Sequence, residues 1–249
     1  MESGNLHHTR GIVIRTVKYG ETSLIATIYT ELFGLQSYII NGVRTSTRKG
    51  SGKANLFQPA AILDLTVYHN ELKNLQRIRE FKWAVLYDQL YFDVIKNSVA
   101  LFMIEMLQKI LKQPENNPDF YHFIEDAFVH LDKAPAQVTA NYPLFFITQL
   151  TYFSGFRITD EYSDTVSYLD LKEGAFVSEL PQHTYTLGKP YTGIISQLLK
   201  VMHPAELDQL PLNQETRRII LQAFLTFYAL HTPEFGKLKT LDVMGAILS

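Results

Sequence analysis

The stretch between residues 44 and 53 has the composition of a phosphate-binding loop. Its four cations, with no acid among them, are Arg44, Arg48, Lys49 and Lys53. The residues between them are small or carry hydroxyls, so the backbone can approach a phosphate and the side chains can donate to its oxygens. A merely solvated loop with this composition is the alternative. The stretch is not a nucleotide-binding P-loop, because Thr47 replaces the first glycine and Ala54 replaces the magnesium-binding hydroxyl.

Further cations occur in strand-like segments on either side of this loop. They are Arg15 and Lys18 before it, and Arg77 and Arg79 after it. Two residues apart on a strand, Arg77 and Arg79 share a face. We expect all eight cations to contact DNA, the alternative for the strand residues being ordinary charge on the solvent side of a sheet. Four rings could stack on bases, although a small domain also needs such rings in its core: Tyr19, Tyr29, Tyr38 and Phe57.

Two other clusters resemble catalytic or metal sites. His122, Asp126 and His130 are four residues apart and share one face of a predicted helix. The apolar residues between them account for the buried side, so we expect this face to be solvated. The acidic residues Asp160, Glu161 and Asp164 lack a nearby base. No nucleophile, base and orienting group occur together, which predicts neither an enzyme nor a metal or cofactor site.

Composition supports a globular protein with two parts of opposite charge. The 249 residues are 46% hydrophobic and contain no cysteine, which excludes disulfides and thiolate zinc sites. Residues 10–82 carry 11 basic and 5 acidic groups, a net charge of +6, while the remainder carries 12 and 20, a net charge of −8. Such asymmetry indicates a polyanion-binding part joined to a part with another task. No apolar targeting segment or membrane span is evident, so we expect a cytoplasmic protein.

Hydrophobic periodicity divides the chain in the same way. Residues 10–82 alternate at period two in five runs separated by turn signals, with one long link after the third run. The runs contain Ile12–Val17, Leu24–Ile28, Tyr38–Ile40, Ile62–Val67 and Asn74–Phe81. Five strands with a long link after strand three are typical of an OB-fold barrel, with an SH3-like barrel as the alternative. The first domain is therefore predicted to span residues 1–82.

Residues 83–249 follow the period of helices. The pattern predicts helices from about Val99 to Gln113, from Asp119 to Leu131, from Tyr142 to Phe153, from Tyr191 to Met202 and from Gln214 to His231. Asn141 is the expected cap of the third helix, with Pro143 in its first turn. Residues 157–186 form an irregular insertion with short strands near 167–171 and 175–177, and the tail from Leu238 to Leu248 is apolar enough to dock back. The fold class is thus α+β, a barrel followed by a mainly helical domain.

The order of several short motifs resembles the bacterial recombination mediator family RecO. They are Gly11–Arg15, Tyr19–Glu21, Tyr29–Glu31 with Gly34, Asn41–Arg44 and Leu56–Pro59 in the barrel, and Tyr168–Phe176 and Leu238–Val243 beyond it. The resemblance covers nearly the whole chain. Many members of that family carry paired cysteines for zinc in the segment equivalent to 157–176, and this chain has none. We expect Tyr162, Tyr168, Leu169 and Phe176 to close that segment by packing instead.

The resemblance implies a non-catalytic DNA-repair protein. It implies binding of single- and double-stranded DNA, annealing of complementary strands, and cooperation with RecR to load RecA onto DNA coated by single-strand binding protein. The acidic tail of that binding protein is implied to dock on the helical domain, where Arg217 and Arg218 are the candidate contacts. Two alternatives remain: a protein-interaction module whose barrel is only a scaffold, and a hydrolase that uses the His122 helix.

Overall fold

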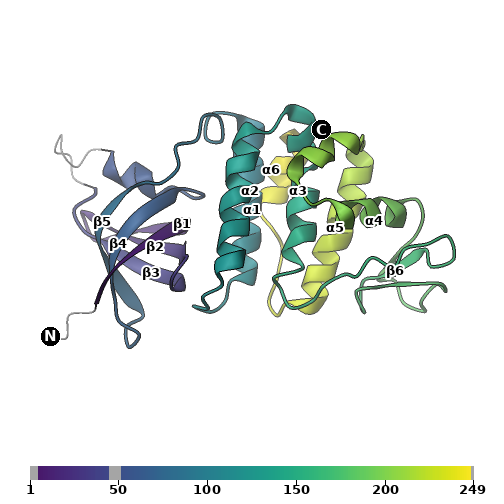
Figure 1. Ribbon diagram of the computed structural model, residues 1–249, viewed down its shortest axis with the longest axis horizontal. Coiled ribbons are helices and arrows are strands. Elements are labelled where there is room, and N and C mark those ends of the chain that lie inside the picture. The colour runs from purple at the N-terminus through teal and green to yellow at the C-terminus, as the bar shows by residue number, and fades with distance from the viewer. Residues whose placement is uncertain (1–4, 45–51, 248–249) are drawn as a thin grey trace. The chain divides into compact units, whose positions relative to one another are not determined.

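The computed structural model describes residues 5–44 and 52–247, arranged as a β-barrel followed by helices (Figure 1). The barrel strands are β1 (Asn5–Tyr19), β2 (Ser23–Thr30), β3 (Gly34–Ile40), β4 (Ile62–His69) and β5 (Leu75–Trp83), with the short 3-10 helix η1 (Lys53–Phe57) before β4. The strands close in the order β1-β2-β3-β5-β4, and only the β3–β5 pair is parallel. This order, with the long link after β3, is the OB plan expected from the sequence.

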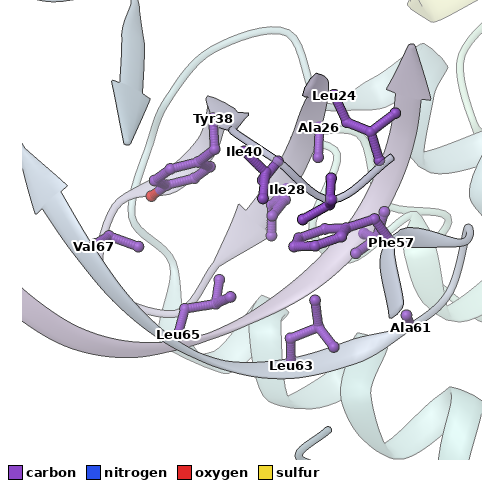
Figure 2. Packing of buried hydrophobic residues seen from close by; sticks show 12 residues of the cluster. Leu24, Ala26, Ile28, Tyr38, Ile40, Phe57, Ala61, Leu63, Leu65 and Val67 are labelled. Carbon is purple, nitrogen blue, oxygen red and sulfur yellow. The ribbon is translucent and has the colours of Figure 1, made fainter. Parts of the chain in front are cut away.

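Alternating side chains of all five strands fill the barrel. Its core contains Val13, Leu24, Ala26, Ile28, Tyr38, Ile40, Leu63, Leu65 and Val67, with Phe57 of η1 among them (Figure 2). Phe57 is 1% exposed and its ring lies 4.8 Å from that of Phe81. The long link therefore contributes a large apolar side chain to the barrel core, and this contact fixes the C-terminal end of the link.

Strand β1 departs from simple alternation. A bulge lies between Val13 and Arg15, and Ile12 and Ile14 are buried although they are outside the barrel core cluster. Gln108 donates to the carbonyl of Ile14 at 3.0 Å, so this part of β1 is covered from outside. Val17, grouped with Ile12 and Ile14 in the sequence pattern, is 40% exposed. The bulge thus separates a covered half of β1 from an exposed half.

The helices are α1 (Val94–Ile110), α2 (Pro118–Lys133), α3 (Ala136–Leu150), α4 (Tyr191–Lys200), α5 (Gln214–His231) and α6 (Thr240–Ile247). Between α3 and α5 lie the small sheet β6 (Tyr168–Asp170), β7 (Ala175–Val177) and β8 (Thr186–Leu187), and the 3-10 helix η2 (Pro204–Gln209). No helix in the described part of the chain is both long and apolar enough to span a bilayer.

The third helix begins six residues before the predicted start. Pro143 lies inside α3, and Asn141, expected as its cap, is fully buried and donates to the carbonyls of Leu207 at 3.2 Å and Leu210 at 2.8 Å. The sequence expectation was wrong because a proline at the first turn and a proline within a buried helix leave the same local pattern, and the partners of Asn141 are more than sixty residues away. Helix α1 begins five residues before the predicted Val99, α2 and α4 agree within two residues at each end, and α5 has the predicted bounds, whereas α6 lies in the tail for which no helix was predicted.

The chain divides into two compact units. The barrel unit comprises residues 1–89 and 107–132, and the helical unit comprises residues 90–106 and 133–249. Helix α2 therefore belongs to the barrel unit, where Tyr29 of β2 lies 5.7 Å and 6.1 Å from the rings of Phe120 and Tyr121. Asp132 at the end of α2 accepts from the backbone amides of Asp88 and Gln89. The domain boundary after Lys82 stays a prediction.

Candidate nucleic-acid interface

The exposed half of β1 carries two of the predicted DNA contacts. Arg15 and Lys18 are both exposed, and their cross-strand partners on β2 are Thr27 and Leu24. Leu24 is a core residue, so Lys18 lies on the inward side at the end of the barrel, whereas Arg15 lies on the outer face. Within the described residues neither cation forms an ion pair. Both charges are available to an anion from solution.

The long link starts and ends against this half of β1. The backbone amide of Arg44 donates to the carbonyl of Thr22 at 2.9 Å, and its guanidinium donates to the carbonyl of Gly20 at 3.1 Å. At the other end, the Thr16 hydroxyl donates to the carbonyl of Phe57 at 2.6 Å. Lys53 is exposed at the start of η1. Both ends of the link are thus bonded to β1 or to the β1–β2 turn, and we call Lys18, Arg44 and Lys53 the rim. Arg48 and Lys49 lie outside the described residues.

Strand β5 carries the remaining two cations in different settings. Arg77 is exposed, and its register partners on the two adjacent strands are Ile39 of β3 and Tyr68 of β4. A bulge follows, so that Arg79 and Glu80 are consecutive exposed residues, joined by an ion pair of 3.5 Å. The charge of Arg79 is partly offset by that neighbour. Arg77 has no such partner among the described residues.

Arg15 and Arg77 belong to one outer surface of the barrel, which we call the open face. Its outward-pointing residues are Arg15, Val17, Ile25, Thr27, Ser37, Ile39, Leu75 and Arg77. These eight residues include two arginines and no acid, and Glu80, the acid on β5, lies beyond them and is paired with Arg79. The open face is therefore positively charged.

The opposite surface of the barrel unit, which we call the paired side, has its charges bound to one another. Arg10 lies 3.2 Å from Glu125 of α2 and 3.4 Å from Asp64 of β4, and Lys82 lies 3.6 Å from Asp64. Glu125 raises the pKa of Arg10 above its usual value. His122 adds contacts of 3.6 Å to Glu31 and 3.8 Å to Glu125. This network is not evident from the sequence, because Glu125 is 115 residues from Arg10.

Three of the four candidate stacking rings are in the interior. Tyr29, Tyr38 and Phe57 are each at most 1% exposed, and burial raises the pKa of Tyr29 to about 12 and that of Tyr38 further. Tyr19, at the end of β1, is 51% exposed. Only Tyr19 of this set can therefore reach a base without rearrangement of the barrel.

The two clusters that resembled catalytic sites have other contacts. His130 bonds the carbonyl of Asp126 at 2.8 Å, while His122 joins the paired side. Across the described residues, no three potential ligands lie close enough to share a metal ion. Asp160 pairs with Lys200 at 3.1 Å and Asp164 pairs with Lys189 at 3.4 Å. These carboxylates are thus ion-pair partners within the helical unit.

The insertion is closed by packing and by one buried carboxylate. Leu169 and Phe176 are buried, and the ring of Tyr162 lies 6.0 Å from that of Phe176. Asp170, 6% exposed, accepts from the amides of Lys172 and Glu173 and lies 3.2 Å from Nε2 of His183. The Asp170 contacts were not foreseen from the sequence. They tie the β6–β7 turn to the segment before β8.

Arg217 and Arg218 border an apolar cavity of about 200 Å³ in the helical unit. Its walls come from α3, α5 and α6 and include Pro143, Leu144, Leu221, Leu225, Leu241 and Met244. Arg217 is half-buried and donates to the carbonyl of Leu212, and burial lowers its pKa. Arg218 is exposed. The sequence pointed to the two arginines but not to the cavity, whose walls come from three separate helices.

Family models cover both parts of the chain. Residues 1–87 match the N-terminal domain of recombination protein O, and residues 91–242 match its C-terminal domain. The chain belongs to the RecO family.

Full-length RecO relatives agree with this assignment. The chain is 31% identical to the DNA repair protein RecO of Christiangramia forsetii over 97% of its own length and 99% of the relative. It is 31% identical to that of Flavobacterium johnsoniae, over 97% and 98%. It is 30% identical to that of Phocaeicola vulgatus, over 98% and 100%. The resemblance seen in the barrel motifs is therefore confirmed over both units.

Proposed function

We propose that this RecO family member is a DNA repair and recombination mediator that binds single- and double-stranded DNA through its barrel and anneals complementary strands. It acts in the cytoplasm with RecR to load RecA onto DNA coated by single-strand binding protein, and it has no catalytic turnover. The observation that carries the proposal is a contrast within the described residues: Arg15, Lys18, Arg44, Lys53 and Arg77 form no ion pair, whereas the charges of the opposite side are paired with one another. Cations without an acidic partner suit phosphates.

The contacts proposed for DNA are Arg15, Lys18, Arg44, Arg48, Lys49, Lys53, Arg77 and Arg79. Arg79 is the weakest of them, because Glu80 competes for its guanidinium. Contacts to phosphates do not discriminate between bases, so we expect binding without sequence specificity.

Fluorescence anisotropy with a labelled single strand tests DNA binding. A barrel that contacts about four to six phosphates gives a log–log dependence of the association constant on salt of roughly −3 to −4. Absence of binding at low salt would refute the mediator function. It would favour the alternative in which the barrel only supports a protein-binding helical domain.

Replacement of the loop cations together, Arg44, Arg48, Lys49 and Lys53 to Gln, tests the loop. We expect annealing to be abolished while circular dichroism and the melting temperature stay close to wild type, because the described members Arg44 and Lys53 are not core residues. The matched control is Lys133→Gln, an exposed cation outside the barrel strands. An annealing rate equal to that of the control would refute the loop assignment.

We propose the cavity beside Arg217 and Arg218 as the site for the acidic tail of single-strand binding protein. The cationic border of the cavity suits an acidic peptide, and its apolar walls can bury an apolar side chain of that peptide. Leu221 lines the cavity and lies outside the barrel unit. Leu221→Asp should abolish binding of a tail peptide in anisotropy and leave binding of naked DNA unchanged. Full peptide affinity in this variant would refute the site.

A further inference from the structure

Four strands bring an aliphatic row together on the open face. Val17 of β1 pairs with Ile25 of β2, which pairs with Ile39 of β3, which pairs with Arg77 of β5. Their neighbours along the strands, Leu24, Ala26, Tyr38 and Ile40, belong to the barrel core. Because successive side chains alternate between faces, the row itself points outward. Val17 is 40% exposed, and Ile25 and Ile39 are half-buried.

A second row of cross-strand partners lies beside the first. Its cation is Arg15 on β1, whereas the cation of the first row is Arg77 on β5. Arg15 pairs with Thr27, Thr27 with Ser37, and Ser37 with Leu75. One arginine thus stands on β1 and the other on β5. Adjacent strands are separated by about 4.8 Å, so a path along the curved barrel wall from the Arg15 backbone to the Arg77 backbone crosses three spacings, roughly 14 Å. A strand of nucleic acid that crosses from β1 to β5 can meet a guanidinium at each edge and aliphatic carbon between them.

Among the described residues, the open face between the two arginines offers no aromatic ring for a base. Tyr29, Tyr38 and Phe57 are buried, and the exposed rings of Tyr19 and Tyr68 lie at the borders, on the end of β1 and on β4 beyond Arg77. Barrels of this type that hold bases against the protein do so by stacking them on aromatic side chains. An aliphatic floor contacts sugars without such stacking.

We propose that the open face binds single-stranded DNA by its backbone alone, with phosphates on Arg15 and Arg77, sugars over Val17, Ile25 and Ile39, and bases directed to solvent. The inference rests on the proposed DNA binding and specifies its geometry. A strand held in this way keeps its pairing edges accessible. The protein then brings two strands together without having to release the bases of either one first.

Permanganate oxidation of thymines in a saturated complex with an oligothymidylate tests the geometry. The probe is bound by the full-length chain at low salt, and anisotropy measures saturation. We expect thymine reactivity within about twofold of the free strand, because unstacked base faces stay open to the reagent. Strong protection of the thymines in a saturated complex would overturn the inference while leaving DNA binding intact. Failure to saturate would instead refute the proposed function.

A ring placed on the floor tests the location. Ile39→Tyr should tighten oligothymidylate binding about fivefold or more, since one base can then stack, and it should slow annealing. Ile39→Val keeps a β-branched side chain and serves as the matched control, with both quantities unchanged. Should Ile39→Tyr fail to fold by circular dichroism, Val17→Tyr replaces it on the same row. Equal affinity and annealing in the ring variant and the control would overturn the inference.

Discussion

Arg10 and Arg15 are five residues apart on one strand and have opposite settings. Arg10 lies before the β1 bulge and is bound to Glu125 and Asp64, whereas Arg15 lies after it with no ion-pair partner among the described residues. The same contrast separates the paired side of the barrel from the open face. Within the described residues, Arg15 is available to an anion from solution because no acid from another segment reaches it, and net charge alone does not reveal this.

The largest expected effect concerns the close packing of β3 against the segment before α2. Gly34 at the start of β3 has φ +61°, and a β-carbon there would lie 2.2 Å from the carbonyl oxygen of Glu115. Gly34→Ala therefore combines backbone strain with a clash against backbone, and we expect a loss of about 3 kcal/mol of unfolding free energy. Urea unfolding measures it. Gly42→Ala, at φ +69° with open space around it, is the matched control and should lose less. Equal losses would show that the contact with Glu115 is not close-packed.

The second effect concerns affinity at the open face. Arg15→Gln with Arg77→Gln removes two proposed phosphate contacts, so the salt dependence should become shallower by about 1.4 and affinity at 0.1 M salt should fall roughly 25-fold. Unfolding free energy should change little, because both side chains are exposed. Anisotropy over a salt series measures the slope. An unaltered slope would show that Arg15 and Arg77 of the open face do not contact phosphates.

A smaller effect on stability is expected at alkaline pH, where Tyr29 of β2 packs against α2. Burial raises the pKa of Tyr29 from 10.0 to about 12, so between these values the unfolded chain loses the phenolic proton while the folded chain retains it. Stability therefore falls as pH rises through that window. Tyr29→Phe cannot ionise and should lose less stability from pH 9 to pH 11 than wild type, as measured by thermal melts. Parallel losses would mean that Tyr29 is not shielded by Phe120 and Tyr121.

The smallest effect is predicted for a cation on the paired side. Lys82 is 77% exposed and its contact with Asp64 is 3.6 Å, so Lys82→Gln should change unfolding free energy by less than about 1 kcal/mol. Its effect on DNA affinity should also be much smaller than that of the open-face pair, although the same unit of charge is removed each time. Equal losses per charge would indicate that DNA responds to overall charge and does not distinguish the two surfaces.

Local patterns predicted much of the fold. Alternation and turn residues located the five barrel strands, and the position of the long link predicted their order, because each signal lies within a few residues of the element it describes. The start of α3 was missed because the contacts of Asn141 with Leu207 and Leu210 override the local proline signal. Likewise, the sequence located cations but not their partners. Glu125 neutralises Arg10 from a helix that the pattern assigned to another domain.

The candidate site was predictable in part for the same reason. The cations of the rim and of β5 stood out by composition, whereas the aliphatic row of the open face appears only when the registers of four strands are combined. The cavity beside Arg217 needs three helices to be placed together. Sequence thus indicated which residues carry charge, and the structure indicates which of them lie together.

If the barrel holds a single strand through the cations of the open face, the salt dependence of single-strand binding must respond to those cations and not to one on the paired side. Anisotropy over a salt series compares wild type, Arg15→Gln with Arg77→Gln, and Lys82→Gln. We expect a slope of roughly −3 to −4 for wild type and for Lys82→Gln, and a slope shallower by about 1.4 for the open-face variant. The same slope in all three proteins, or a shallower slope only in Lys82→Gln, would show that the open face does not hold the strand.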